Sequence, residues 1–250
     1  MTTSPAPWVQ LAHAALLGVA LLVSALLLDG PLTIQADVVR PHDVQRRAGP
    51  VGCASNVVVV GLHPWSSSAA AYMRSVRYAV GPACAQVVTL DGPLPEGSGR
   101  AWLRTMARSP QQALLAREAE HSADELAARL QRWGRLGARL VVTGHSQGAI
   151  VGWTLAARHL ELRARYVLSA GMLPGVTIRP GDGEVHAVHG RADTHVPVAR
   201  AREGAARLSR AGRRVVYREL ETGHNLRDGL YRTWTDQLRA AVAAAAAGPQ

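Results

Sequence analysis

The sequence predicts an α/β fold in which a mostly parallel central sheet carries helices on both faces. Short apolar runs alternate with longer helical patterns along most of the chain, an order typical of parallel strands joined by crossover helices. The first run, Val57–Val60, is continuous and β-branched, as expected of a strand buried on both faces. A length of 250 residues and a hydrophobic content of 48% allow a substantial core.

Six strands and five helices can be placed along the chain. The expected strands are 57–60, 86–90, 140–143, 165–169, 184–189 and 215–219. The expected helices are 67–80, 110–134, 147–159, 197–212 and a last helix from about residue 226. We therefore expect four parts: an N-terminal apolar helical segment (1–30), a linker (31–52), the α/β domain (53–243) and an Ala-rich tail (244–250).

Composition excludes several classes of protein. Two cysteines are too few for a disulfide-dense scaffold or a cysteine-based zinc ribbon. The formal charge is +10, and all 28 basic residues are arginine. The arginines are scattered as singles and pairs, aromatic residues are few, and no nucleic-acid motif occurs, so we expect no nucleic-acid partner. Attraction to anionic lipid surfaces fits this charge better.

The segment Trp8–Leu28 bears on location. Its 21 residues contain no charged side chain, and as a helix it would extend about 31 Å, close to the hydrocarbon thickness of a bilayer. A membrane anchor, a cleaved export signal and a buried segment are the three interpretations. Arg40, Arg46 and Arg47 follow the segment and favour a cytoplasmic position for the domain. We expect a membrane-anchored or exported protein. The cysteines, discussed below, favour the periplasmic or extracellular side over the cytoplasmic face.

The motif Gly144-His145-Ser146-Gln147-Gly148 lies directly between an apolar run and a helical pattern. Ser146 should therefore occupy a tight turn from a strand into a helix, where small residues two positions before and after it are needed. The start of the helix favours a developing negative charge. This context predicts a nucleophilic serine; the alternative is a serine that only caps the helix.

A serine nucleophile needs a base and an acid that orients it. His224 follows the last strand and is the expected base, with His195 as an alternative. Asp193 follows the preceding strand and is the expected acid; the alternatives, Asp182 and Glu184, lie at the opposite end of that strand. The expected chain order is nucleophile, acid, histidine.

An oxyanion hole needs two backbone N–H donors directed at one point. One should be the amide of Gln147, which follows the nucleophile. The other should come from the loop after the first strand, where Pro64 has no N–H and Trp65 is the best candidate.

These motifs resemble a known family. GHSQGA at 144–149, HGRADTHVP at 189–197 and GHN at 223–225 are similar to the phospholipase/carboxylesterase family of α/β-hydrolases, which includes acyl-protein thioesterases and small bacterial carboxylesterases. The likeness covers residues 55–242 and implies the α/β-hydrolase fold. It also suggests that Trp102, in a Gly-rich stretch, lies beside the substrate groove, and we expect His63 to line the same groove. The chain departs from the family at Pro64, where a glycine is usual.

The two cysteines form a pair only if the family's strand order holds. Cys53 and Cys84 precede strands that are adjacent and parallel in that fold, so their thiols would lie at the same end of the sheet, close enough for a disulfide. Two free thiols are the alternative. A disulfide would favour an exported domain.

Together the motifs predict a serine hydrolase that acts on small acyl esters or thioesters through Ser146, His224 and Asp193, without a metal or cofactor. A lipase or peptidase chemistry stays open, because a fold does not determine the substrate. The alternative from another class is a catalytically silent, membrane-anchored binding protein on the same fold. The oligomeric state is not predicted.

Overall fold

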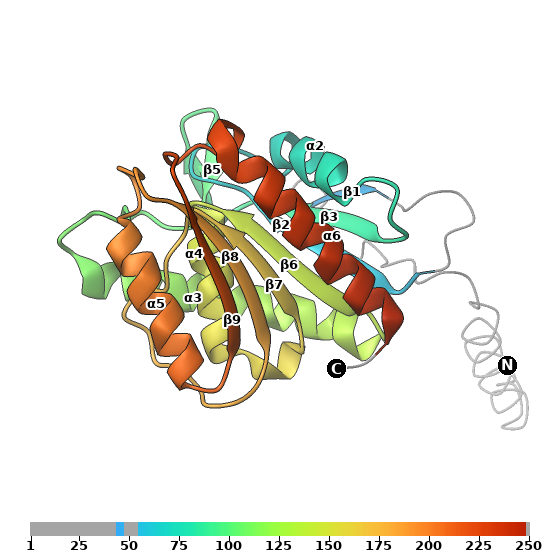
Figure 1. Cartoon of the computed structure of the whole chain (residues 1–250). Helices are drawn as coiled ribbons and strands as arrows, with labels where there is room; N and C mark the ends of the chain where they lie inside the picture. The colour runs from blue at the N-terminus through green and yellow to red at the C-terminus, as the bar shows by residue number, and fades with distance from the viewer. Residues whose placement is uncertain (1–43, 48–54, 249–250) are drawn as a thin grey trace, which may run out of the picture. The chain divides into compact units, whose positions relative to one another are not determined.

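A seven-stranded sheet forms the centre of the described part of the chain, residues 44–47 and 55–248 of this computed structural model (Figure 1). The strand order is β1-β3-β2-β6-β7-β8-β9, and only the β1–β3 pair is antiparallel. The strands are β1 (Val44–Arg47), β2 (Val57–Leu62), β3 (Gln86–Leu90), β6 (Arg139–His145), β7 (Arg165–Ser169), β8 (Glu184–Gly190) and β9 (Arg214–Leu220). The expected parallel sheet is therefore confirmed.

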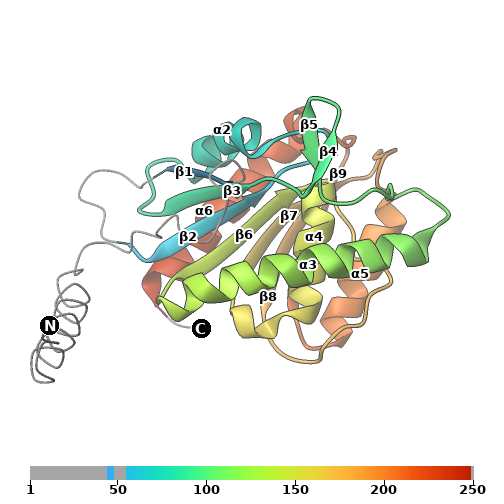
Figure 2. The same ribbon diagram turned by 180° about the vertical axis from the view of Figure 1, so that it is seen from behind.

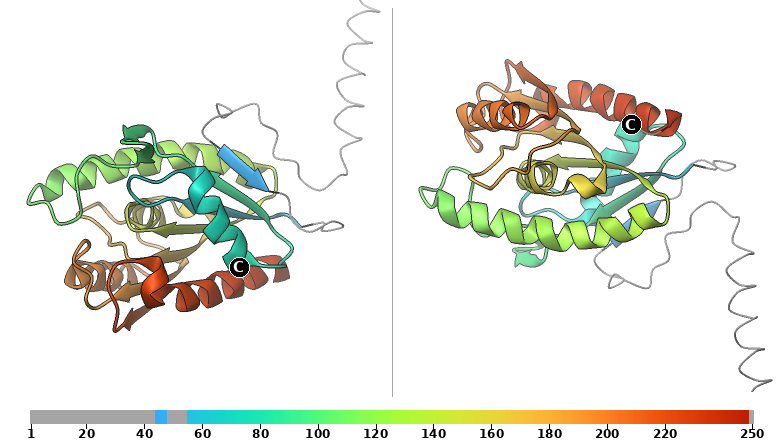
Figure 3. Two further views of the ribbon diagram at one scale, coloured as in Figure 1. Left: turned by 90° about the horizontal axis from the view of Figure 1, so that it is seen from above. Right: turned by 90° about the horizontal axis from the view of Figure 1, so that it is seen from below.

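Helices cover both faces of this sheet (Figures 2 and 3). α3 (Gln112–Arg135), α4 (Gln147–Arg158) and α5 (Val198–Arg210) bury their apolar sides on one face. α2 (Ala69–Val80) and α6 (Tyr231–Ala247) bury theirs on the other. All six residues of β2 are buried between the two layers, which explains its uninterrupted apolar sequence.

Four short elements complete the described part of the chain. The strands β4 (Leu94–Glu96) and β5 (Gly99–Ala101) form an antiparallel hairpin between β3 and α3. A 3₁₀ turn, η2 (Leu160–Leu162), follows α4, and a π turn, η3 (Leu226–Leu230), precedes α6. The last expected helix thus begins with a turn of different geometry.

The strand β1 lies within the range that we expected to be a linker. Val44–Arg47 pairs antiparallel with β3, with Val44 opposite Leu90 and Arg47 opposite Val87. The sequence VQRR has no strand periodicity. Its pairing with a distant edge of the sheet, rather than any local pattern, makes it a strand.

The parallel strands place their ends at two opposite edges of the sheet. Leu62 pairs with Gly144 and Gly190 pairs with Leu220, so β2, β6, β8 and β9 all end at one edge, here called the carboxyl edge. The opposite edge, where these strands begin, is called the amino edge. Loops after the strands, which carry every expected catalytic residue, therefore meet at the carboxyl edge.

The strand β9 forms one side margin of the sheet. Among the described residues it pairs only with β8. Glu219 on β9 forms ion pairs with Arg202 of α5 (2.8 Å) and with Arg191 (3.2 Å), and Arg191 also contacts Glu221. Charged side chains therefore gather along this margin.

Some expectations concern residues outside the described part. The segment Trp8–Leu28 and Cys53 lie outside it. Within residues 44–47 and 55–248, no helix combines the length and the apolar character needed to cross a bilayer. Cys84, just before β3, is disulfide-bonded rather than free. The pairing with Cys53 stays a prediction.

Candidate active site

Ser146 occupies a tight turn between β6 and α4, at the carboxyl edge. Its φ of 54° lies in the left-handed region, which residues with a side chain rarely adopt, so the turn is strained. Main-chain hydrogen bonds hold it: the Ser146 N–H donates to the Ser169 carbonyl, and the Ile150 N–H donates to the Ser146 carbonyl, both at 3.0 Å. The sheet and the first turn of α4 thus fix the hydroxyl at the start of a helix.

The two glycines of the motif are required by close main-chain contacts. A Cβ atom on Gly144 would lie 2.6 Å from the carbonyl group of Gly148. A Cβ atom on Gly148 would lie 2.1 Å from the Leu62 carbonyl oxygen and 2.7 Å from that of His63. The turn can therefore pack against the loop after β2 only when both positions lack a side chain.

Ser146, Asp193 and His224 come together at the carboxyl edge from three separate loops. His224 Nε2 lies 2.9 Å from Ser146 Oγ, and His224 Nδ1 lies 2.7 Å from Asp193 Oδ2. Because the carboxylate can only accept, Nδ1 carries the ring proton and Nε2 is left to accept the hydroxyl proton of Ser146. This is the arrangement that a general base requires.

The Asp193 carboxylate is buried and well supplied with donors. Its Oδ1 accepts from the N–H groups of His195 and Val196, both at 2.8 Å. His189 Nε2 lies 3.2 Å from Oδ2 and 2.9 Å from the Val196 carbonyl; since both are acceptors, this nitrogen carries a proton. Burial alone would raise the pKa of Asp193, but the hydrogen bonds from His189, His224 and Val196 hold it well below its ordinary range.

Two further histidines pack around His224. The exposed His195 ring stacks on it with centroids 4.7 Å apart, and the buried His145 ring lies at 5.2 Å. Burial, followed by repulsion from His224, lowers the pKa of His145 to about 3. His145 is therefore neutral near pH 7 and does not oppose a positive charge on His224. His224, and not the alternative base His195, is hydrogen-bonded to Ser146.

Asp193, His195 and His224 are also the described residues whose ligand atoms come close enough to hold a metal ion. One atom from each lies within 4.8 Å of the others. The Asp193 and His224 atoms are already joined by a 2.7 Å hydrogen bond, and a metal would have to displace the proton between them. The geometry therefore favours proton transfer over metal binding at this cluster.

The loop between β2 and α2 lies against the nucleophile turn through the Gly148 contact described above. Gln147 is the first residue of α4, so its N–H has no acceptor within the helix. The Gln147 side chain is buried, and it accepts from the Trp102 N–H (2.8 Å) and donates to the Leu103 carbonyl (2.7 Å). It thus ties the segment after β5 to the turn. Trp65 lies in the β2–α2 loop with a partly exposed side chain.

His63 and Trp102, which we expected to line a substrate groove, are both buried. Their exposed fractions are 0% and 5%. His63 Nδ1 donates to the Pro64 carbonyl and Nε2 accepts from the Gly92 N–H, while Trp102 Nε1 donates to the His63 carbonyl. Burial lowers the pKa of His63, in keeping with a neutral ring. These contacts hold the β2–α2 loop in place, and a role in a substrate groove stays a prediction.

Sequence reasoning missed the contacts of His145 and His189 with the site. His189 is buried at the end of β8, and it donates toward Asp193. A signal was available, because His189 stands four positions before Asp193 at the end of a strand. His145 directly precedes the nucleophile. Because successive side chains of a strand point to opposite faces, the sequence did not indicate that both His145 and Ser146 approach His224.

Comparisons with known proteins add the following. No protein-family model matches the sequence, and none of the curated proteins matches it. The structure is similar to that of esterase PE8, with a TM-score of 0.64 and 19% identity over 80% of this chain and 98% of the other. It is also similar to a carboxylesterase from Mesorhizobium loti (TM-score 0.61, 20% identity, 76% and 89% covered) and to the Bacillus cereus carboxylesterase (TM-score 0.61, 20% identity, 79% and 93% covered).

This chain has the α/β-hydrolase fold. In α/β-hydrolases the nucleophile sits on a strained strand-to-helix turn, and the acid and the histidine follow it along the chain. Ser146, Asp193 and His224 occur in that order and meet at the edge where this fold places its chemistry. What the site does is argued from its own geometry, because the fold hosts many activities.

Proposed function

We propose that this chain is a serine hydrolase that cleaves carboxylic esters or thioesters through an acyl-enzyme. The observation that carries the proposal is the continuous series of hydrogen bonds from Asp193 through His224 to Ser146, at 2.7 Å and 2.9 Å, on a strained turn at the carboxyl edge. Structures with the same fold include proteins named esterase and carboxylesterase, which supports this class of substrate.

In the first half of the reaction, Ser146 Oγ attacks the carbonyl carbon of the substrate while His224 Nε2 takes the hydroxyl proton. The carbonyl oxygen becomes an oxyanion, held by the Gln147 N–H and, we propose, by the Trp65 N–H. The imidazolium of His224 is stabilised by the ionised Asp193. As the tetrahedral intermediate collapses, the alcohol or thiol leaves with the proton from His224, and the acyl group stays on Ser146.

In the second half, water attacks the acyl carbon and His224 Nε2 takes one of its protons. A second tetrahedral intermediate forms in the same oxyanion hole. Its collapse releases the carboxylic acid and returns the proton to Ser146 Oγ. Only protons and electron pairs move between groups that the chain and the substrate supply, so the reaction calls for no cofactor.

The test is hydrolysis of p-nitrophenyl acyl esters of increasing chain length. We expect Ser146→Ala to lose roughly 10³-fold or more in turnover. Ser209→Ala, an exposed serine on α5, is the matched control and should behave as wild type. Wild-type turnover in Ser146→Ala would contradict the mechanism.

A fluorophosphonate probe separates the enzyme from a silent binding protein on the same fold. An activated serine attacks the phosphorus atom and displaces fluoride, so we expect labelling of the wild type and none of Ser146→Ala. An unlabelled wild type that turns over no ester would favour the silent protein. The chain-length profile then separates short-chain esters from lipid substrates.

We also propose that Trp8–Leu28 attaches the domain to a membrane or directs its export. The segment's length and lack of charge support this, and the bonded state of Cys84 supports an oxidising compartment. Protease treatment of intact cells, followed by thiol titration of the denatured protein with and without reductant, tests it. An exported domain should be cut and should release two thiols only after reduction. A protected domain with two free thiols would contradict it.

A further inference from the structure

A pocket lies at the amino edge of the sheet, opposite the edge that carries Ser146. Its volume is about 930 Å³. Residues at the beginnings of β6, β7 and β8 line it, together with the end of α3, the turn η2 and the end of α6. We call it the amino-edge pocket. The proposed hydrolytic reaction uses none of its residues.

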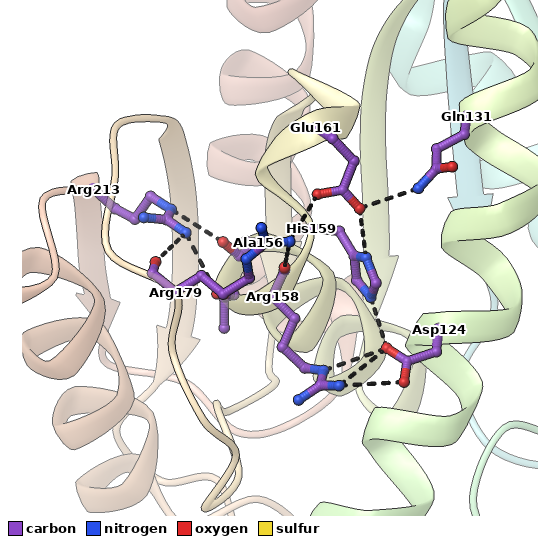
Figure 4. Close-up of polar contacts among 9 residues, drawn as sticks. Asp124, Gln131, Ala156, Arg158, His159, Glu161, Arg179 and Arg213 are labelled. Atoms are coloured by element: carbon purple, nitrogen blue, oxygen red, sulfur yellow. Dashed lines mark hydrogen bonds and ion pairs between the residues drawn. The ribbon is translucent and has the colours of Figure 1, made fainter.

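The charged groups of the amino-edge pocket leave an excess of positive charge. Two of its three acids are already paired: Glu184 with Arg165 and Arg214, and Glu161 with His159 and Arg179. Figure 4 shows the carboxylate of Glu161 directed toward His159 and Gln131. The third acid, Asp182, is exposed.

Four other arginines in the lining form no ion pair with a carboxylate of the described residues. They are Arg135, Arg139, Arg163 and Arg213. Against one exposed acid, four such cations make the pocket attractive to an anion.

Arg213 is the most unusual of these arginines, because it is only 4% exposed. Its guanidinium donates to main-chain carbonyls, among them those of Ala156 (3.1 Å) and Arg179 (3.0 Å), as Figure 4 shows. Burial lowers the pKa of Arg213. These carbonyls satisfy its hydrogens, and the exposed Asp182 attracts its charge without forming a close ion pair with it. A buried charge is costly unless it is paired.

The Tyr166 hydroxyl provides an independent indication of a ligand. Tyr166 is 5% exposed and lines the same pocket, and its hydroxyl has no hydrogen-bond partner among the described residues. Buried hydroxyl groups nearly always have a partner, so a ligand that reaches this group from the pocket would supply the acceptor that it lacks. It also lies close enough to Arg213 for the two to interact electrostatically.

The rest of the lining is apolar. It includes Leu130, Leu140, Leu160, Ala164 and Val185. A ligand that fits both parts has a compact anionic head and a hydrocarbon portion. We propose that the amino-edge pocket binds a small amphipathic anion whose carboxylate or phosphate head accepts from Tyr166 and faces the arginines.

Calorimetric titration of the full chain with octanoate, octyl phosphate, inorganic phosphate and octanol tests this proposal. We expect saturable binding of octanoate or octyl phosphate, and which of them binds more tightly identifies the head. Phosphate and octanol should bind at least tenfold more weakly, since phosphate has no hydrocarbon portion and octanol has no charged head. Tyr166→Phe should weaken binding roughly tenfold, the value of one charge-assisted hydrogen bond. Arg163→Asn, at a left-handed position that asparagine tolerates, should also weaken it.

Tyr72→Phe is the matched control. The Tyr72 hydroxyl is likewise buried, but it lies beside Thr143 and outside the pocket. We expect the Tyr72→Phe variant to bind the anions as tightly as wild type does. All of these variants should keep wild-type ester hydrolysis. The proposal would be overturned if neither octanoate nor octyl phosphate bound, or if inorganic phosphate bound as tightly as they do. It would also be overturned if Tyr166→Phe and Tyr72→Phe changed the affinity equally. If the protein hydrolysed no ester but still bound these anions, the proposed function would be wrong and this proposal would not be affected.

Discussion

Replacing Gly148 by alanine tests how the nucleophile turn is positioned. The added Cβ would lie 2.1 Å from the Leu62 carbonyl oxygen, whereas carbon and oxygen atoms ordinarily approach to about 3.3 Å. Both neighbours, Leu62 and His63, contribute main-chain atoms, so no flexible side chain can move aside. The turn and the β2–α2 loop must therefore separate by roughly 1 Å.

Such a separation acts on both reaction and stability. A displacement of about 1 Å at a reacting group can reduce turnover by about 10²-fold. Overpacking a buried contact costs about 1–3 kcal/mol of unfolding free energy. We therefore expect Gly148→Ala to remain folded, with a melting temperature lower by several degrees, and to lose about 10²-fold in kcat on a p-nitrophenyl ester.

Gly134→Ala is the matched control for this prediction. A Cβ atom on Gly134, near the end of α3, would meet no atom within 4 Å. In a helix this change should stabilise the protein by up to about 1 kcal/mol and leave kcat unchanged. If Gly148→Ala kept both wild-type kcat and wild-type melting temperature, the steric reasoning about the turn would be refuted.

Two further predictions concern the residues around His224. Asp193→Asn should lower kcat by roughly 10²–10⁴-fold, because an amide no longer fixes the tautomer of His224 that carries its proton on Nδ1. His195→Ala should lower kcat less than about tenfold. A larger loss in His195→Ala than in Asp193→Asn would make His195 the base. The buried, neutral His145 should make stability depend on pH. Between pH 6.5 and about 3 the unfolded chain binds a proton at this residue that the folded chain does not, so stability falls as pH falls. Urea unfolding at pH 6 and pH 5 measures this effect. The free energy of unfolding should fall more in wild type than in His145→Asn, by about 1.4 kcal/mol per pH unit. An equal fall in both proteins would contradict the prediction.

Much of the fold could be predicted because its signals are local. Each of the six expected strands occurs, since continuous apolar runs such as Val57–Val60 have no alternative but burial. The glycines at 144 and 148 indicated the turn for a steric reason that the structure makes explicit. The place of His224 followed from its position just after the last strand.

The remaining features depend on contacts between distant parts of the chain. Trp102 is buried because its indole reaches the His63 carbonyl, 39 residues away in sequence. The four residues of β1, three of them polar, form a strand only because β3 offers them a free edge. The amino-edge pocket likewise depends on Tyr166 and Arg213, which the fold brings together. No local periodicity contains such information.

The charged margin at β9 has a consequence for the behaviour of the protein in solution. An edge strand presents unpaired amides that can recruit a second chain, and the apolar run Val215–Tyr217 would promote such stacking. Arg214, Arg218 and the Glu219 ion pairs surround that run with charge that another molecule would have to desolvate. These residues therefore protect concentrated protein from aggregation through this strand, and substitutions that neutralise them should reduce solubility before they affect activity.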